Sequence, residues 1–159
     1  MRDSVTVEMA ASPDEIWTLL SDVTRIGEFS PETLEAEWLG GATGPAVGAK
    51  FRGHVKRNGR GPMYWTECRV TQSVPGAAFE FAVVLKERTI NTWGYEIAPA
   101  VGDGTTKVTE YFALTPTFAT RAYWKIAGRW RKKTNQNGMR TTLERVRAVV
   151  EAPTPPGVS

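Results

Sequence analysis

Strand-length segments joined by short turns fill the middle of the chain, and this pattern restricts the fold more than any other feature. Between Leu34 and Ala113, apolar and polar side chains alternate in runs that are typical of β-strands. The segments that separate these runs are rich in glycine and proline. Six strands are expected, at about 34–39, 49–57, 63–73, 78–85, 91–98 and 106–114. The short links predict an antiparallel meander, because parallel neighbours need long crossovers.

The residues before this region predict one further strand and two short helices. Alternating valines favour a strand over 4–9. Ser12 can then cap a helix, Pro13 suits its first position, and Glu15 stands where a capping box has its acidic residue. A second short helix is expected through Ile26.

The C-terminal segment predicts a long helix. No proline occurs between Pro116 and Pro153, and apolar residues recur at helical spacing. The clearest series is Met139, Leu143, Val146 and Val150. A helix over 117–150 would be roughly 50 Å long, so we expect it to bend or break near Gly128 or Gly138.

These elements together define the expected fold class. A sheet with one apolar face must be covered, and only the C-terminal helix is long enough to do so. We therefore predict an α+β fold in which a curved seven-stranded antiparallel sheet wraps around a long C-terminal helix, with two short helices after strand 1. One domain is expected over 1–151, followed by a proline-rich, disordered tail over 152–159.

Several motifs carry a family resemblance. They are 11–17 with 20–22 and 29–31, Trp65 with 68–70, 75–76 with 79–81, 93–95 with 104–110, and Gly138-Met139 with Leu143. Over roughly residues 3–150 the chain resembles the START-like (SRPBCC) superfamily, and within it the polyketide cyclase/dehydrase branch. The resemblance implies a helix-grip fold around a cavity for an apolar molecule. Members include binders, carriers and enzymes, so the resemblance leaves the activity open.

Composition and charge restrict the cellular setting. The chain has 159 residues, a net charge of +3 and one cysteine, Cys68, so no disulfide can form within it. The N-terminus lacks the apolar core of a signal peptide, and no apolar run approaches the roughly 20 residues that span a bilayer. We expect a cytoplasmic protein with no stable membrane insertion.

Metal and cofactor sites are not expected. His54 is the single histidine, and together with Cys68 it cannot form a usual zinc ligand set. The glycines at 40–48 do not match phosphate-binding spacings. The alternation of Phe51 and Gly53 places His54 on the opposite strand face from the expected core.

Aromatic residues on one face of several strands are the most informative candidates. If these faces point inward, the interior is either a filled aromatic core or the wall of a ligand cavity. The expected partner is a hydrophobic small molecule, such as a lipid or a polyketide. The candidate ligand-binding residues are Phe51, Trp65, Phe81, Trp93, Tyr95, Glu110, Phe112, Phe118, Ala122 and Ile126.

Glu110 is the acidic residue in this set. A carboxyl group in an apolar interior is either paired or has a raised pKa, and the second kind can serve as a general acid or base. The structural alternative is a partner, Arg69 or Tyr95, that holds the strands together. The candidate catalytic residues are Glu110, Tyr95, Arg69 and His54.

Basic residues are concentrated between Arg121 and Arg147. Such a stretch can attract nucleic acid or an anionic membrane. The helical spacing of Phe118, Ala122 and Ile126 instead favours a core side and a solvated charged side, so no nucleic acid partner is expected. Three functions therefore stay open: a binding protein, a polyketide cyclase or dehydratase, and a surface-binding protein. The ligand and the oligomeric state are not determined by the sequence.

Overall fold

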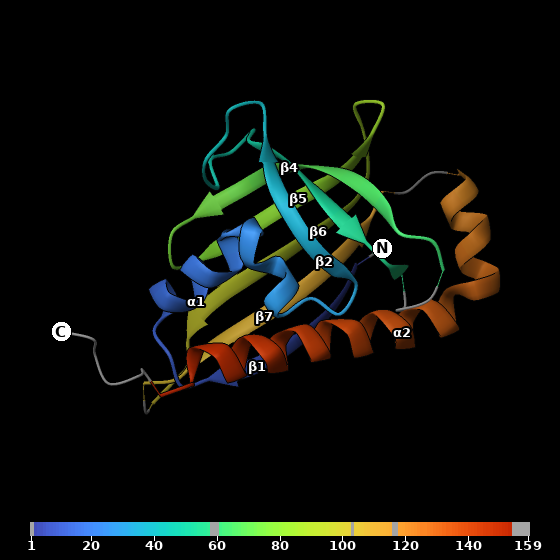
Figure 1. Cartoon of the computed structure of the whole chain (residues 1–159). Helices are drawn as coiled ribbons and strands as arrows, with labels where there is room; N and C mark the ends of the chain where they lie inside the picture. The colour runs from blue at the N-terminus through green and yellow to red at the C-terminus, as the bar shows by residue number, and fades with distance from the viewer. Residues whose placement is uncertain (1, 58–60, 103, 116–117, 154–159) are drawn as a thin grey trace.

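Seven strands and three helices make up the part of the chain that is described (Figure 1). The computed structural model describes residues 2–57, 61–102, 104–115 and 118–153, without the side chains of 118–131. The elements are β1 (Arg2–Met9), α1 (Pro13–Ser21), the 3-10 helix η1 (Val23–Glu28), β2 (Thr33–Leu39), β3 (Lys50–Val55), β4 (Tyr64–Val74), β5 (Ala78–Leu85), β6 (Arg88–Pro99), β7 (Thr106–Leu114) and α2 (Phe118–Val150). The expected tail, 152–159, lies mostly outside the described residues.

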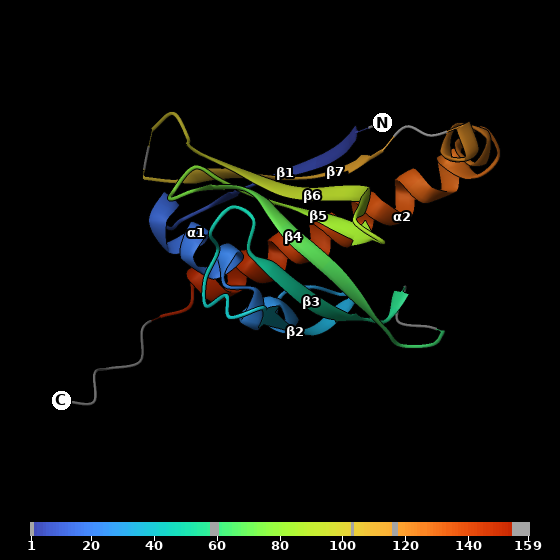
Figure 2. The same cartoon turned by 90° about the horizontal axis from the view of Figure 1, so that it is seen from above.

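The strands form one antiparallel sheet in the order β1-β7-β6-β5-β4-β3-β2. From β2 to β7, neighbours in sequence are neighbours in the sheet, which confirms the predicted meander. β1 and β2 are the two edges, and α1 with η1 carries the chain from one edge to the other. The predicted α+β fold with a curved sheet around a C-terminal helix is confirmed (Figure 2).

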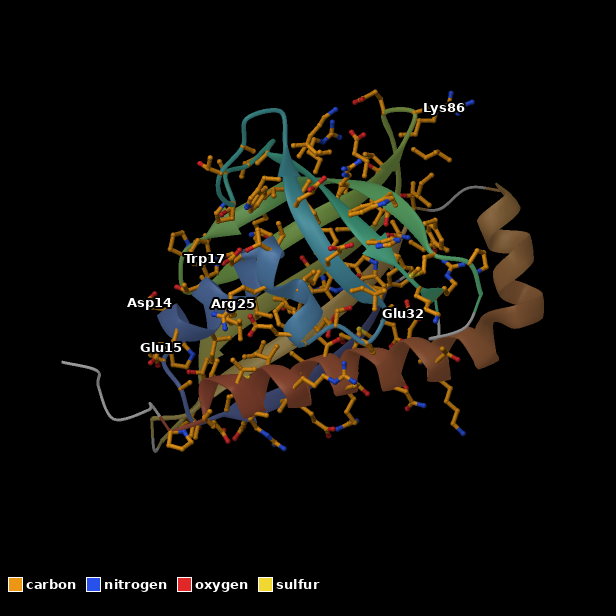
Figure 3. The ribbon with its side chains drawn as sticks, viewed as in Figure 1. Asp14, Glu15, Trp17, Arg25, Glu32 and Lys86 are labelled. Atoms are coloured by element: carbon orange, nitrogen blue, oxygen red, sulfur yellow. The ribbon has the colours of Figure 1, made fainter. Side chains whose placement is uncertain are left out.

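Helix α1 begins as the sequence predicts. The Ser12 hydroxyl accepts a hydrogen bond from the Glu15 amide at 3.2 Å, and a Glu15 carboxylate oxygen accepts one from the Ser12 amide at 3.0 Å. This reciprocal pair is a complete capping box. Trp17 then fixes the helix to the sheet, because its indole nitrogen donates to the Ala78 carbonyl of β5 at 2.9 Å (Figure 3).

Helix α2 lies along β1 and supplies the centre of the core. Its Leu143 and Val146 side chains are fully buried. The Gln136 amide donates to the Asp3 carboxyl at 3.0 Å, and the Ala10 amide donates to the Glu151 carboxylate at 2.7 Å. From 136 to 151 the helix rises about 23 Å, and from 3 to 10 the strand also rises about 23 Å, so the two elements match in length.

The N-terminal part of α2 extends beyond this match. Residues before Gln136 continue past the beginning of β1, and the ribbon bends so that this part stands beside the end of the sheet (Figures 1 and 2). The predicted bend is confirmed, and it occurs within a single helix rather than at a break. The straight part of α2 therefore runs along the length of β1, α1 contacts one end of the sheet, and the other end adjoins the bent part of α2.

Candidate ligand site on the inner face of the sheet

The inner face of the sheet is the face that carries the core and is covered by α1 and α2; the outer face is its opposite. Strand pairing arranges the inner residues of β5, β6 and β7 in three parallel rows. The first row is Phe79, Tyr95 and Glu110, the second is Phe81, Trp93 and Phe112, and the third is Val83, Asn91 and Leu114. The predicted aromatic face is therefore present and contains Glu110.

Burial changes along this face. Phe79 in the first row and Val108 beyond it are almost completely buried at the end near α1. Val83, Trp93 and Leu114 are only partly buried, although they lie on the same face and pack against the same core. These three residues lie toward the end where β7 leads into the bent part of α2.

Aromatic rings contact one another across the strands. Trp93 and Phe112 lie 4.7 Å apart between ring centroids with a 52° tilt. Phe51 of β3 meets Phe81 edge-on at 5.2 Å, and Trp38 of β2 meets Phe51 at 5.8 Å. The inner face thus carries two groups of contacting aromatic rings, one on β2, β3 and β5 and one on β6 and β7, and such rings suit a flat apolar partner.

Glu110 is buried on this face, with 4% of its surface exposed. The Tyr95 hydroxyl donates to its Oε1 at 3.4 Å, which is a long hydrogen bond. Its Oε2 has no hydrogen-bond partner among the described residues. Burial raises the pKa of the Glu110 carboxyl well above its usual value, and the Tyr95 hydrogen bond opposes this shift only in part. Burial likewise raises the pKa of Tyr95, with the neighbouring acid adding to the effect.

This environment determines what Glu110 can do chemically. A carboxyl group with a raised pKa keeps its proton over a wider pH range, so it can donate a hydrogen bond or a proton to an oxygen atom placed beside it. The pairing with Tyr95 that the sequence left open is present, whereas the pairing with Arg69 is not. Arg69 lies on the outer face of β4, where its nearest acid is Glu87 at 3.9 Å.

Two further polar residues on the inner face escaped the sequence analysis. Asp3 of β1 shares this face with Val5 and lies opposite Phe112, and Asn91 of β6 shares it with Trp93. Asp3 Oδ2 and Asn91 Oδ1 are shielded from water without a partner among the described residues. Their alternation with apolar residues in the same strands is the signal that could have revealed them.

Three predicted site residues, Trp65, His54 and Arg69, lie on the outer face of the sheet. Trp65 stacks on His54 at 4.5 Å between ring centroids, both on the outer face, and Trp65 is 44% exposed. Cys68 points inward, and side chains three residues apart on a strand lie on opposite faces, so Trp65 points outward. Its assignment to the ligand site was therefore wrong. His54 faces outward as its alternation predicted, and neither it nor Arg69 can reach Glu110 from there.

Other candidates are excluded or lie outside the described part of the chain. Burial raises the pKa of the Cys68 thiol to about 12, which makes it a poor nucleophile. In the described ranges, no three His, Cys, Asp or Glu residues gather in a way that could hold a metal ion. The side chains of Phe118, Ala122 and Ile126 lie outside the described residues, as does the part of the basic stretch from Arg121 to Arg131. Their roles stay predictions.

The fold, with its inner aromatic face, is that of the START-like class. The chain matches the model of the family described as polyketide cyclase/dehydrase and lipid transport over residues 2–151. It belongs to this family, whose description concerns hydrophobic small molecules. None of the curated proteins matches the chain.

Solved structures show the same fold. A START superfamily protein of Mycobacterium smegmatis has a TM-score of 0.73 and 18% identity, covering 94% of this chain and 97% of its own. A polyketide-cyclase-like protein of Corynebacterium glutamicum has a TM-score of 0.56 and 24% identity, covering 94% of this chain and 88% of its own. At these identities the likeness concerns the fold alone.

Among the described helices, none has the length and apolar character needed to cross a bilayer. The cytoplasmic location expected from the sequence stays a prediction.

Proposed function

We propose that this protein binds a hydrophobic or aromatic small molecule against the inner face of the sheet, at the end where β7 leads into α2. The observation that carries the proposal is the incomplete burial of Val83, Trp93 and Leu114. A filled core would shield these side chains as it shields Phe79. A ligand covering them would gain roughly 25 cal/mol per Å² of apolar surface, before the costs of association.

The family supports this proposal. Polyketide cyclisation, dehydration and lipid transport, the activities in the family description, all require a protein to hold an apolar molecule away from water. The bent part of α2 stands beside the same end of the sheet (Figure 2), so a ligand there would lie between a helix and an aromatic wall. The transport or modification of the ligand is a finer step within the same proposal.

The direct test is to look for a bound molecule. Native mass spectrometry of gently purified protein should reveal an apolar ligand whose mass is lost on denaturation. The extracted ligand, added back, should raise the melting temperature, because a molecule that binds only the folded state stabilises it. Finding no co-purifying molecule, and no melting shift with a panel of fatty acids and polycyclic aromatics, would contradict the proposal.

A matched pair of variants locates the site. Val83→Gln puts a polar side chain in the partly buried third row, whereas Val101→Gln makes the same change at a fully exposed loop position. We expect Val83→Gln to remove most of the ligand-induced melting shift and Val101→Gln to leave it intact. Equal shifts in the two variants would place the ligand elsewhere.

A second candidate function is enzymatic, and the environment of Glu110 is the observation that favours it. A buried carboxyl group with a raised pKa and one free oxygen is suited to move a proton on an enolisable ring or ketone. Glu110→Gln distinguishes the two functions. A cyclase or dehydratase should lose turnover of an aromatic polyketide, while a binding protein should keep its ligand-induced stabilisation.

A further inference from the structure

Three oxygen atoms on the inner face are shielded from water and have no hydrogen-bond partner among the described residues: Asp3 Oδ2, Glu110 Oε2 and Asn91 Oδ1. Buried polar atoms in proteins are almost always paired, and an unpaired one costs free energy. All three lie on β1, β6 and β7, facing the same side of the sheet as Trp93 and Phe112. One bound molecule that completes the hydrogen bonds of all three atoms is a single explanation for them.

The three atoms fall into two groups. Asp3 and Glu110 are diagonal neighbours on β1 and β7, so their Cα atoms are roughly 7–8 Å apart. Asn91 lies opposite Leu114 at the far end of β6. From strand spacings of about 4.8 Å and a rise of about 3.4 Å per residue, Asn91 lies roughly 12–14 Å from the other two.

Apolar rings lie between the two groups. The Trp93 and Phe112 rings, 4.7 Å apart, occupy the row between Glu110 and Asn91. Any molecule that reaches both polar groups must lie across these rings, and its middle part must therefore be apolar.

We propose that the ligand is an elongated, flat, apolar molecule with a hydroxyl group near each end, one bound by Asp3 and Glu110 and the other by Asn91, with its body against Trp93 and Phe112. This inference rests on the proposed function and adds the chemical class of the ligand.

A hydroxyl group suits both positions because it donates and accepts. Burial raises the pKa of Glu110, so the neutral acid can donate to the hydroxyl oxygen while the hydroxyl proton bonds to Asp3. A ligand ammonium group is less suitable because the neutral Glu110 provides no negative charge beside it. A ligand carboxylate is less suitable because it would be a third acidic group beside Asp3 and Glu110. At Asn91, a hydroxyl pairs with the side-chain amide in either orientation of that amide.

Four stilbenes that share the same flat core provide the test. 4,4′-Dihydroxystilbene has a donor at each end, 4-hydroxystilbene has a donor at one end, 4,4′-dimethoxystilbene has no donor and an additional methyl group at each end, and trans-stilbene is wholly apolar. Fluorescence titration of the full chain should show the dihydroxy compound binding at least about tenfold more tightly than the dimethoxy compound, because each lost hydrogen bond weakens binding about two- to tenfold. 4-Hydroxystilbene should fall between them.

Variants then assign the two ends. Asn91→Leu should weaken binding of the dihydroxy compound several-fold and leave dimethoxystilbene binding unchanged, and Thr92→Val, on the outer face next to it, should change neither. Asp3→Asn keeps an oxygen for Gln136 but replaces the free oxygen by an amide group, and should also weaken only the dihydroxy compound. Melting temperatures of each variant show that it is folded.

The outcomes separate this inference from the proposed function. Equal affinity for all stilbenes would overturn the hydroxyl inference while leaving an apolar ligand site in place. Failure of every stilbene to bind would also overturn it, and the mass-spectrometric search would then decide the proposed function independently.

Discussion

The two faces of the sheet differ in whether their polar side chains have partners. On the outer face they pair across strands: Arg2 with Glu96, Lys107 with Glu8, and Tyr111, whose hydroxyl donates to Glu80 at 2.6 Å. On the inner face, Asp3, Asn91 and Glu110 each keep a shielded oxygen without a partner among the described residues. The sheet can therefore pair its polar side chains closely. The unpaired oxygens are a feature of the inner face, where a ligand is proposed.

The largest expected effect is on the free energy of unfolding, and it tests whether the core lies between the inner face and α2. Leu143 is completely buried where α2 covers the sheet, and Leu143→Ala should lower the free energy of unfolding by about 2–5 kcal/mol. The same change at Leu85, which is 62% exposed, should cost no more than about 0.5 kcal/mol. Urea denaturation measures both. Similar losses at the two positions would contradict the assignment of the core to the α2 side.

The next effect concerns the pH dependence of stability. The unfolded chain releases the Glu110 proton near its usual pKa of about 4.3, whereas the folded protein retains it because burial raises the pKa. Between these two pKa values the folded state binds more protons, so stability falls as pH rises, by at most about 1.4 kcal/mol per pH unit. Glu110→Gln removes this loss. Its stability relative to the wild type should therefore increase as pH rises above about 4.3 and level off only above the raised pKa of the folded protein.

An outer-face acid provides the control for this measurement. Glu80 accepts hydrogen bonds from Thr71 at 2.7 Å and from Tyr111, so Glu80→Gln removes a paired carboxyl group. The rising difference should be specific to Glu110→Gln. A difference that stays constant with pH would show that the inner carboxyl group is solvated in the folded protein, and the contrast between the faces would fail.

The third effect is on ligand affinity. Trp93 lies on the inner face and Trp65 on the outer face, so Trp93→Leu and Trp65→Leu make the same change on opposite sides of the sheet. With 4,4′-dihydroxystilbene as the probe, Trp93→Leu should weaken binding about tenfold, because aromatic contacts contribute up to about 1.5 kcal/mol beyond their area. Trp65→Leu should leave the fluorescence titration unchanged. An equal loss in both variants would argue against a site on the inner face.

Strand phase explains which of these features the sequence could predict. Phe51 fixes the outward direction of His54, which was predicted correctly. Val108 and Phe112 share a strand face with Glu110, but the sequence left open whether that face points inward, and burial in the structure shows that it does. Trp65 was assigned by residue type rather than by phase with Cys68, and the assignment was wrong.

Other features depend on contacts between distant elements. One oxygen of Asp3 accepts a hydrogen bond from Gln136 of α2, which leaves the other oxygen without a partner among the described residues. One oxygen of Glu110 accepts from the Tyr95 hydroxyl, 15 residues away in the sequence, which leaves its second oxygen without a partner in the described part of the chain. Helical spacing predicted α2, but its position along β1 is fixed by contacts of Gln136 and Glu151 with Asp3 and Ala10. Periodicity within one segment contains no information on such contacts.

The smallest effect tests whether the outer face acts independently. Arg52 lies over the Trp65 ring at 4.5 Å and forms an ion pair with Glu37. The side chains of Arg52 and Glu37 are both about half exposed. Arg52→Ala should therefore cost only about 0.5–1 kcal/mol in low salt, and less in 0.5 M salt, where the ion pair is screened. Because these contacts lie on the face opposite Trp93, ligand affinity should not change. A loss of stability that does not depend on salt would contradict the assignment of these contacts to a solvent-exposed ion pair. A lower affinity for 4,4′-dihydroxystilbene would mean that the contacts of Arg52 influence the inner face, so that the two faces do not act independently.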